Sequence, residues 1–566
     1  MRPIPGKRHH WAVLVLLAVV AGNTLLTWRS EKVTSQQANM LAETLKRNDP
    51  SLLTHDAVFA GRWRLYPAAW HGLMSWALDL FGRRDPIDAL RVVGAGTLLV
   101  YLLAAYTLLY RQTHSIGVSV LVAVMSTAIF SLKRPYWGLG PLATVGPRSL
   151  VLAVIPLVVL GFLRQRTRWT VAAVFLGAGL LGNVHLPSGV NLVLVMFLAM
   201  LAVGRFRPRV LALAAASLAA AAVGALPAML DYARTLGEAR AFLAPASGAD
   251  VRAALNVAGV HLLYPGVLNE FLRWLPVAAM LAIPAGILIS RGGRYRVRNL
   301  PDWVALAAAA LLVAGGAHGA MQWLGHRLGT APPVLEFFDA LRLAMLPLYV
   351  LFAQAAVHLL RLTRTHRGWA QAVVVVFAAA VVGSSFNVLP LRHMIRDRLR
   401  RLGGKPAERQ EHLDKAELRV LARWAAREEN TRRDAVFVTP HAEVRLRARR
   451  SVLWCPADVR YVYYFAPQRL GAWARDVQDL CSLLSPPAGS RADADRIVAF
   501  VDTYWARRGG GAAPTFVVIP SAVAPAPTRH LEEIPPPADA PAWGTHWRLY
   551  RVRAMAPDAS EGESPD

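Results

Sequence analysis

The sequence is poor in cysteine, in lysine and in acidic residues. Its 566 residues include two cysteines, Cys455 and Cys481, which excludes a disulfide-rich scaffold and any zinc site built on several cysteines. Both lie in the polar C-terminal part. They form one disulfide if that part is extracytoplasmic, or remain two buried thiols. The sequence also lacks a Walker loop and a GxSxG motif, so the P-loop and serine-hydrolase signatures are absent.

The basic residues are nearly all arginine. Lysine and arginine total 63 against 36 acidic residues, and the formal net charge is +27. In the first part of the chain the arginines form short clusters between apolar stretches, which is typical of membrane topology rather than of a nucleic-acid-binding face. The excess of positive charge also fits attraction to anionic lipid head groups or phosphates. Alternatively, the preference for arginine partly reflects the base composition of the genome. We therefore expect the lipid bilayer as a partner and no nucleic acid.

Long apolar stretches dominate the sequence up to residue 391. The chain is 55% hydrophobic with a mean hydropathy of +0.34, too apolar for a soluble protein of this length. About eleven stretches approach the length of a membrane-spanning helix: 11–28, 88–110, 115–131, 149–163, 169–184, 188–204, 209–229, 274–290, 301–324, 341–360 and 369–390. The first is expected to be a retained helix rather than a cleaved signal peptide.

The arginine clusters predict an orientation. They recur in alternate loops, near residues 111, 164–168, 205–209, 291–298 and 361–367, which places those loops on the cytoplasmic side. An odd number of crossings then places the polar tail outside, in the compartment of the long first loop, 29–87. The arginines of 392–401 favour the opposite side, but long domains cross largely regardless of charge. We predict a bacterial inner-membrane protein with an extracytoplasmic tail.

The sequence therefore predicts an α-helical polytopic membrane protein with a C-terminal α/β domain. Its parts are a multi-pass domain (1–391), a basic linker (392–410), a soluble α/β domain (411–555) and a disordered end (556–566). The α/β prediction rests on alternating helices and strands: helices over 413–429, 470–484 and 492–506, and strands over 435–439, 451–454, 515–519 and 547–552. Two further helices, over 31–47 and 66–81, are expected in the first loop, the second lying in the membrane interface.

Acidic residues of the first loop are candidates for chemistry. Asp49 and Asp56, with Glu31 nearer the first helix, lie where a carboxylate serves as a general base or holds a divalent metal such as Mg or Mn against a phosphate. The alternative is that Asp49 and Asp56 are turn or helix-cap residues, since Asp-Pro and Thr-His-Asp are common in turns.

Polar residues at the outer ends of apolar stretches form a second group. His185 lies in a tight turn. There it binds a phosphate or shuttles a proton, or it forms hydrogen bonds with the exposed carbonyl groups at the end of a helix. Arg148 begins an apolar helix, where the helix dipole and the guanidinium favour an anion, unless the side chain anchors the helix in the interface. Asp339 and Arg342 have the spacing of a pair on one helix face. We expect Arg342 to face a polar cavity rather than lipid.

The order of short motifs resembles the type C superfamily of glycosyltransferases, the polyprenyl-phosphate-sugar-dependent membrane enzymes. It is most similar to a poorly characterised set of bacterial multi-pass proteins. The motifs are Asp49-Pro50-Ser51-Leu52 with Asp56, Pro147-Arg148, His185-Leu186-Pro187, and the tail segments Leu421–Trp424 and Asp434–Pro440. The resemblance implies a catalytic base in the first loop and a polyprenyl-phosphate-linked sugar as donor. An adjacent acidic pair and the WWDYG-type motif of oligosaccharyltransferases are missing.

Three functions follow as hypotheses. The first is an inverting membrane glycosyltransferase with an extracytoplasmic acceptor, in which Asp56, Asp49 or Glu31 is the base. His185, Arg148, Arg342 and Asp339 then bind the donor. The second is a transporter or flippase for a lipid-linked precursor, although the internal repeat common in transporters is absent. The third is an envelope assembly protein, whose first-loop carboxylates are freely replaceable.

Overall fold

The computed structural model describes most of the chain outside several loops and the two ends. The described residues are 6–30, 33–60, 65–82, 85–128, 145–164, 167–239, 248–257, 272, 274–276, 278–283, 286, 290, 298–328, 336–362, 367–384, 409–487, 489–507, 513–537 and 543–553. The predicted linker at 392–410, apart from its last two residues, and the predicted disordered end lie outside them, as does Glu31.

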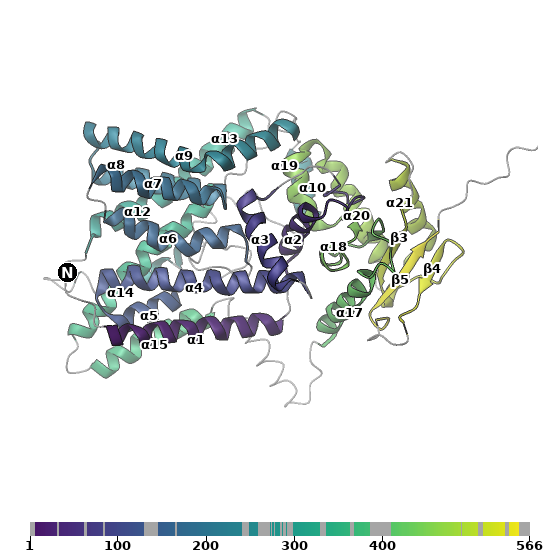
Figure 1. Cartoon of the computed structure of the whole chain (residues 1–566), viewed down its shortest axis with the longest axis horizontal. Helices are drawn as coiled ribbons and strands as arrows, with labels where there is room; N and C mark the ends of the chain where they lie inside the picture. Colours follow the sequence, from purple (N-terminus) through teal and green to yellow (C-terminus); the bar gives the residue numbers. More distant parts are fainter. Residues whose placement is uncertain are drawn as a thin grey trace, which may run out of the picture.

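The first part of the chain is a bundle of apolar helices, drawn in purple to teal in Figure 1. Its elements are α1 (Gly6–Ser30), α4 (Pro86–Thr113), α5 (Ile116–Met125), α6 (Pro147–Leu163), α7 (Arg168–Gly182), α8 (Leu186–Val203), α9 (Pro208–Ala239), α12 (Leu300–Leu312), the π-helical turn η3 (Val313–Ala317), α13 (His318–Leu328), the 3-10 turn η4 (Phe337–Ala340), α14 (Leu341–Leu362) and α15 (Arg367–Ser384). One hydrophobic core runs through them.

Six helical stretches of the described chain are long and apolar enough to cross a membrane: His9–Trp28, Pro86–Thr113, Leu186–Val203, Pro208–Arg234, Leu300–Met321 and Phe337–Arg361. Five shorter apolar helices accompany them, at Ile116–Met125, Pro147–Leu163, Arg168–Gly182, Trp274–Ile283 and Gln371–Gly383. Every apolar stretch predicted from the sequence overlaps one of these helices. A multi-pass membrane protein is therefore confirmed, while eleven crossings stays a prediction.

Helices α7 and α9 pack with their backbones in close contact. A methyl group added at Gly179 would lie 2.0 Å from the carbonyl oxygen of Ala221, and one at Gly224 would lie 2.5 Å from that of Leu176. Lipid tails are as apolar as leucine, so helices in a membrane associate through such close contacts between small residues. These glycines hold the loop between α7 and α8 in place, and His185 belongs to that loop.

The first loop forms two helices, α2 (Ser35–Asn48) and α3 (Ala68–Phe81), close to the predicted ranges. Thr34 begins α2 with a capping box, in which Gln37 binds back to the Thr34 amide. Every residue from Gln37 to Thr44 is buried, so α2 is covered on all sides. Figure 1 shows α2 and α3 between the bundle and the C-terminal part.

Helix α3 has two faces. Trp70 and Met74 are buried, whereas Trp76 and Phe81 expose 56% and 41% of their surface. An aromatic outer face of this kind suits the membrane interface, and the interfacial location of this segment stays a prediction.

The C-terminal part contains a mixed sheet of five strands in the order β2-β1-β3-β5-β4. The strands are β1 (Val436–Val438), β2 (Ser451–Val452), β3 (Thr515–Pro520), β4 (Leu531–Ile534) and β5 (Trp547–Val552). Strands β2, β1 and β3 are parallel, and β5 and β4 join antiparallel. The helices are α17 (Arg409–Ala425), α18 (Ala442–Ala448), α19 (Val459–Phe465), α20 (Leu470–Leu484) and α21 (Ala494–Ala506). The predicted α/β class is confirmed; α18, α19 and β4 were not predicted.

Helices cover both faces of this sheet, because the central strands are apolar on both sides. Val517 and Ile519 of β3 face the core formed with α20 and α21. Phe516 and Val518 alternate with them and face the core formed with α17 and α18. Because successive side chains of a strand point to opposite faces of the sheet, one layer of helices packs on each side of it.

The C-terminal part packs against the first loop. Leu446 and Phe465 share one hydrophobic core with Leu41, Phe59 and other residues of 38–93. Helix α10 (Gly248–Val257), from the predicted outer loop 230–273, packs against α19 and α20 in a further core. The structure thus brings two predicted outer loops and the tail together, while the side of the membrane on which they lie stays a prediction. Cys455 and Cys481 are both free, so the disulfide alternative is wrong.

Candidate functional site

Three apolar helices begin next to one another with polar side chains. Arg148 is the second residue of α6, His185 is the N-cap of α8, and Arg342 lies in the first turn of α14. The amide groups of a helix N-terminus point outward and carry a partial positive charge. The start of these helices is thus suited to an anion before any side-chain charge is counted.

Arg148 connects α6 to the start of α14. Its guanidinium forms ion pairs with Glu336 and with Asp339, whose Oδ2 lies 3.0 Å from Nη1. Asn191 of α8 donates a 3.0 Å hydrogen bond to the Glu336 carbonyl. Burial alone would raise the pKa of Glu336, but Arg148, and then His185 and Arg460, lower it to about 2. Arg148 therefore points into the protein and does not anchor α6 in the interface.

His185 is the helix cap of α8 and also part of this cluster. Its Nδ1 accepts hydrogen bonds from the Ser188 amide at 3.3 Å and from the Ser188 hydroxyl at 2.8 Å. Burial, and next the charge of Arg148, lower the pKa of His185 to about 3. The ring is therefore neutral at physiological pH, with its proton on Nε2, where it is a hydrogen-bond donor and not a cation.

Arg342 is the unusual member of the group. Its side chain is 1% exposed, and none of its three guanidinium nitrogens has a hydrogen-bond partner among the described residues. The predicted pair between Asp339 and Arg342 is not formed, because Asp339 binds Arg148 instead. A guanidinium presents five N–H donors and stays charged, so a buried one without partners requires an anion nearby.

The four residues predicted to bind substrate thus belong to one electrostatic cluster. Asp339 interacts with Arg148 and Arg342, and His185 interacts with both arginines as well. Two members escaped the sequence analysis as binding residues, Glu336 and Arg460. Glu336 lies three residues before Asp339, at the start of the same apolar stretch, so its position in the sequence could have identified it. Arg460 is one of many arginines in the tail, and nothing in the sequence distinguishes it.

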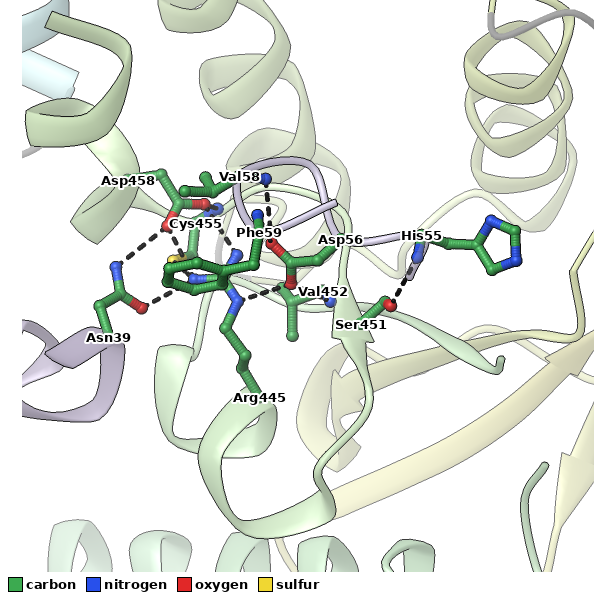
Figure 2. Close-up of polar contacts among 10 residues, drawn as sticks. All are labelled: Asn39, His55, Asp56, Val58, Phe59, Arg445, Ser451, Val452, Cys455 and Asp458. Atoms are coloured by element: carbon green, nitrogen blue, oxygen red, sulfur yellow. Dashed lines mark hydrogen bonds and ion pairs between the residues drawn. The ribbon is translucent and has the colours of Figure 1, made fainter. Parts of the chain in front are cut away.

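Asp56 occupies a different place, buried between the first loop and the tail (Figure 2). Its Oδ1 accepts the amides of Val58 and Phe59 at 2.9 and 3.1 Å. Its Oδ2 accepts the Val452 amide at 2.9 Å and Arg445 Nε at 2.7 Å. The carboxylate is 0% exposed and both oxygens are in use. This geometry does not suit a base that takes a proton from an incoming hydroxyl.

Arg445 is the centre of that buried network. Besides Asp56 it binds both oxygens of Asp458, at 2.7 and 3.1 Å, and the Asn39 side chain at 2.7 Å. Its Cζ lies 5.0 Å from the ring centroid of Phe59. Burial by itself would lower the pKa of Arg445, but Asp458 and Asp56 raise it well above its ordinary value. The network connects α2 and the first loop to α18 and the turn before α19.

A second buried network connects the same two parts. Glu43 of α2 accepts the Tyr461 hydroxyl at 2.7 Å and binds His71 Nε2 at 2.9 Å. His71 Nδ1 lies 2.9 Å from the hydroxyl of Thr44. The sequence analysis missed Glu43, because its partners His71 and Tyr461 are 28 and 418 residues away along the chain.

Asp49 lies on the surface, and its side chain is 42% exposed. Its Oδ1 accepts the Ser51 amide at 2.9 Å and the Ser51 hydroxyl at 2.5 Å, and Oδ2 lies 3.6 Å from Arg433. The hydrogen bonds from Ser51 lower its pKa. These are the contacts of the turn residue that the sequence allowed as an alternative.

Asp49 and Asp56 do not fit the expected Mg or Mn site. Asp49 and Asp56 engage different partners, and Asp56 has no free oxygen. Within the described ranges, no three His, Cys, Asp or Glu side chains gather in a way that would hold a metal ion.

Comparisons with known proteins give a distant likeness of overall arrangement. No protein-family model matches the sequence, and no curated protein matches it. The structure is similar to the oligosaccharyltransferase of Archaeoglobus fulgidus in its apo form, with a TM-score of 0.45 and 12% identity over 91% of this chain and 70% of that one. It is likewise similar to the oligosaccharyltransferase AglB of that organism in complex with an inhibitory peptide and a dolichol-phosphate, with a TM-score of 0.44 and the same identity and coverage. At this level of similarity neither activity nor site residues transfer to this chain.

Proposed function

We propose that this protein is a membrane glycosyltransferase that binds the phosphate of a polyprenyl-phosphate-linked sugar at the cluster of Arg148, His185 and Arg342. The observation that carries the proposal is the buried guanidinium of Arg342, which has no hydrogen-bond partner within the described part of the chain. It lies at the first turn of α14, beside the starts of α6 and α8, whose dipoles favour an anion.

The cluster favours a lipid-borne phosphate over a soluble one. Its residues begin apolar helices with the length or composition of membrane helices, so the site lies at one end of the bundle. Under the predicted topology this is the outer end. A polyprenyl chain places its phosphate at this depth while its tail stays in the hydrocarbon core. A lipid-linked sugar at that site then faces the outer loops and the tail.

The transfer step needs a carboxylate next to the phosphate. Glu336 and Asp339 are the carboxylates of the cluster, and Asp339 is the one a single turn from Arg342. The acceptor hydroxyl gives its proton to Asp339, and its oxygen bonds to the anomeric carbon of the sugar. The bond from that carbon to the phosphate oxygen breaks, and polyprenyl phosphate leaves with its negative charge held by Arg342.

Binding and transfer are tested separately on purified protein in nanodiscs. Titration with a polyprenyl phosphodiester should give saturable binding, which Arg342→Gln weakens about 10- to 100-fold through the loss of a charge-assisted contact. Arg168→Gln is the matched control, since Arg168 begins α7 and is exposed. Asp339→Asn should keep binding and lower sugar transfer from a radiolabelled donor by about 100-fold or more. Equal binding by wild type and Arg342→Gln contradicts the site.

A binding protein without transferase activity is the second candidate. It is favoured by the structural use of Asp56, whose oxygens are all engaged with Arg445 and backbone amides. A transporter or an assembly protein needs the phosphate site but no base. Saturable binding of the lipid-linked sugar without any release of sugar, with every candidate acceptor tried, supports this function over the first.

A further inference from the structure

Asn191 of α8 is buried and uses only one half of its side-chain amide. Its residue is 2% exposed, and its Nδ2 donates a 3.0 Å hydrogen bond to the Glu336 carbonyl. Because a carbonyl oxygen only accepts, this contact fixes the amide nitrogen on that side and the amide oxygen on the other. The oxygen, Oδ1, is buried and has no hydrogen-bond partner among the described residues. Buried polar atoms nearly always have a partner, so this oxygen requires an explanation.

Asn183, the C-cap of α7, shows how an asparagine with a purely structural role is bound in the same region. Its Nδ2 donates to the carbonyls of Leu180 and Gly224 at 3.1 and 2.8 Å. Its Oδ1 accepts the Ala228 amide at 2.9 Å. Both halves of that amide are therefore used by the fold, whereas within the described chain Asn191 uses its donor half alone.

The side chain of Asn191 lies beside the carboxylates of the proposed site. The Glu336 carbonyl that binds Asn191 also accepts the backbone amide of Asp339 at 2.9 Å, so the two donors meet at one oxygen atom. The carboxylates of Glu336 and Asp339 both pair with Arg148. Direct contacts thus place Asn191 next to the carboxylate that is proposed as the base.

The donor half of Asn191 has a structural role. The backbone of Glu336 has a φ of 47°, in the left-handed region that residues with a side chain rarely adopt. Asn191 binds the carbonyl of Glu336 and Arg148 binds its carboxylate, so both its main chain and its side chain are held. Such a conformation persists only where the surrounding contacts fix it. This role explains Nδ2 and leaves Oδ1 for a ligand.

We propose that Asn191 is a sugar-binding residue, whose Oδ1 accepts a hydrogen bond from the group on the carbon next to the anomeric carbon of the lipid-linked sugar. The inference rests on the proposed function, in which the anomeric carbon is bonded to the phosphate and attacked by the hydroxyl that Asp339 deprotonates. The neighbouring carbon carries the donor closest to this reaction. That donor is a hydroxyl in hexoses and an amide N–H in N-acetylhexosamines, and hydrogen bonds to it strengthen in glycosyl transition states.

The test compares ligands as well as variants. Full-length protein in phosphatidylcholine nanodiscs is titrated with a polyprenyl phosphohexose, with its analogue carrying hydrogen in place of the donor group, and with polyprenyl methyl phosphate, which has no sugar. The hexose is glucose, galactose or N-acetylglucosamine, whichever binds most tightly. Wild type should prefer the parent compound to the analogue about 10- to 100-fold. Asn191→Ala should reduce this preference to less than about threefold, and the matched control Asn183→Ala should keep it.

The outcomes separate this inference from the proposed function. Equal affinity of wild type for the parent compound and the analogue overturns the inference, and this result does not depend on the folding of any variant. A preference that survives in Asn191→Ala also overturns it, as does a loss that is the same for all the phosphodiesters, because Asn191 then only holds Glu336. Saturable binding of polyprenyl methyl phosphate that Arg342→Gln weakens leaves the proposed function standing in each of these cases. No saturable binding by the wild-type protein overturns both proposals.

Discussion

At the scale of single residues, the proposed site depends on a buried guanidinium without a hydrogen-bond partner among the described residues. Arg342 is buried in the first turn of a membrane helix, and its nitrogens lack partners among the described residues. Desolvating a guanidinium costs several kcal/mol, and only excellent pairing offsets that cost. Arg342 therefore lowers the stability of the empty protein, which is expected of a binding residue and not of a structural one.

Replacing Arg342 should accordingly separate stability from binding. Arg342→Met keeps the length of the side chain and removes the buried charge, so the empty protein should be as stable as wild type or more stable by about 1–4 kcal/mol. The thermal midpoint of wild type should rise when polyprenyl phosphate is added, and that of Arg342→Met should not. A variant that unfolds more easily without lipid would mean that Arg342 is structural.

The protonation state of His185 predicts a flat pH profile. Its folded pKa of about 3 lies below the ordinary value of 6.5. The unfolded chain therefore binds a proton at His185 more readily, and the free energy of unfolding falls as the pH drops from 6.5 towards 3. A phosphodiester does not titrate in this range either. Its affinity should therefore be constant between pH 5.5 and 8, measured in one buffer series at fixed ionic strength. A tenfold tighter binding at pH 5.5 would show that His185 gains a proton.

Sequence reasoning identified single residues only where lipid makes polarity costly. Arg148, His185, Asp339 and Arg342 are distinguishable because they interrupt or begin apolar helices, and the structure brings them together. In the polar tail a charged residue does not stand out from its neighbours, so the same reasoning cannot select one. Arg445 and Arg460 are two among many arginines, and their roles depend on partners hundreds of residues away, such as Asp56 for Arg445.

At the scale of elements, α2, α18 and α19 form the junction between membrane and tail. Two buried polar networks and one apolar core hold them together. Breaking one side of a buried ion pair leaves an uncompensated charge, which costs much more than losing a surface pair. The junction is therefore sensitive to single polar substitutions that the surface tolerates.

Asp56→Asn should destabilise this junction by about 3–5 kcal/mol, since Arg445 then loses one of its two carboxylates. Asp49→Asn should change stability by less than about 1 kcal/mol, since Asp49 is exposed. Limited proteolysis and thermal unfolding measure both effects. An Asp56→Asn protein of wild-type stability that no longer transfers sugar would return Asp56 to the role of catalytic base.

Elements with strong periodicity could be predicted, and short ones could not. The ranges of α20 and β5 were predicted to the residue, because one is a long amphipathic helix and the other is a short run rich in aromatic and β-branched residues. Helices α18 and α19 have seven residues each, and arginines and aromatic residues obscure their pattern. Helix α2 was predicted, but its burial on all sides was not, because the tail that covers it is distant in sequence.

At the scale of the whole molecule, the first loop, the loop containing α10 and the tail lie on one side of the bundle (Figure 1). The starts of α6, α8 and α14 face the same side. The predicted topology, with an odd number of crossings, puts the tail in the compartment of the first loop, and it stays a prediction. The buried contacts could not be predicted, because topology assigns a compartment and not a packing.

Reporter fusions test the compartment. Alkaline phosphatase fused after residue 553 should be active in a bacterial host, because the tail is then outside the cytoplasm. The same reporter inserted between Leu163 and Arg168, at the other end of α6, should be inactive. Both sites lie outside the buried junction. The reverse pattern would place the tail in the cytoplasm and would invert the orientation of the phosphate site.

The most direct test of the central claim is an experimental structure of the full-length protein in nanodiscs containing a polyprenyl-phosphate-linked sugar. We expect density for the phosphate within hydrogen-bonding distance of the Arg342 guanidinium, at the starts of α6, α8 and α14. A phosphate bound elsewhere, with Arg342 still without a partner, would contradict it.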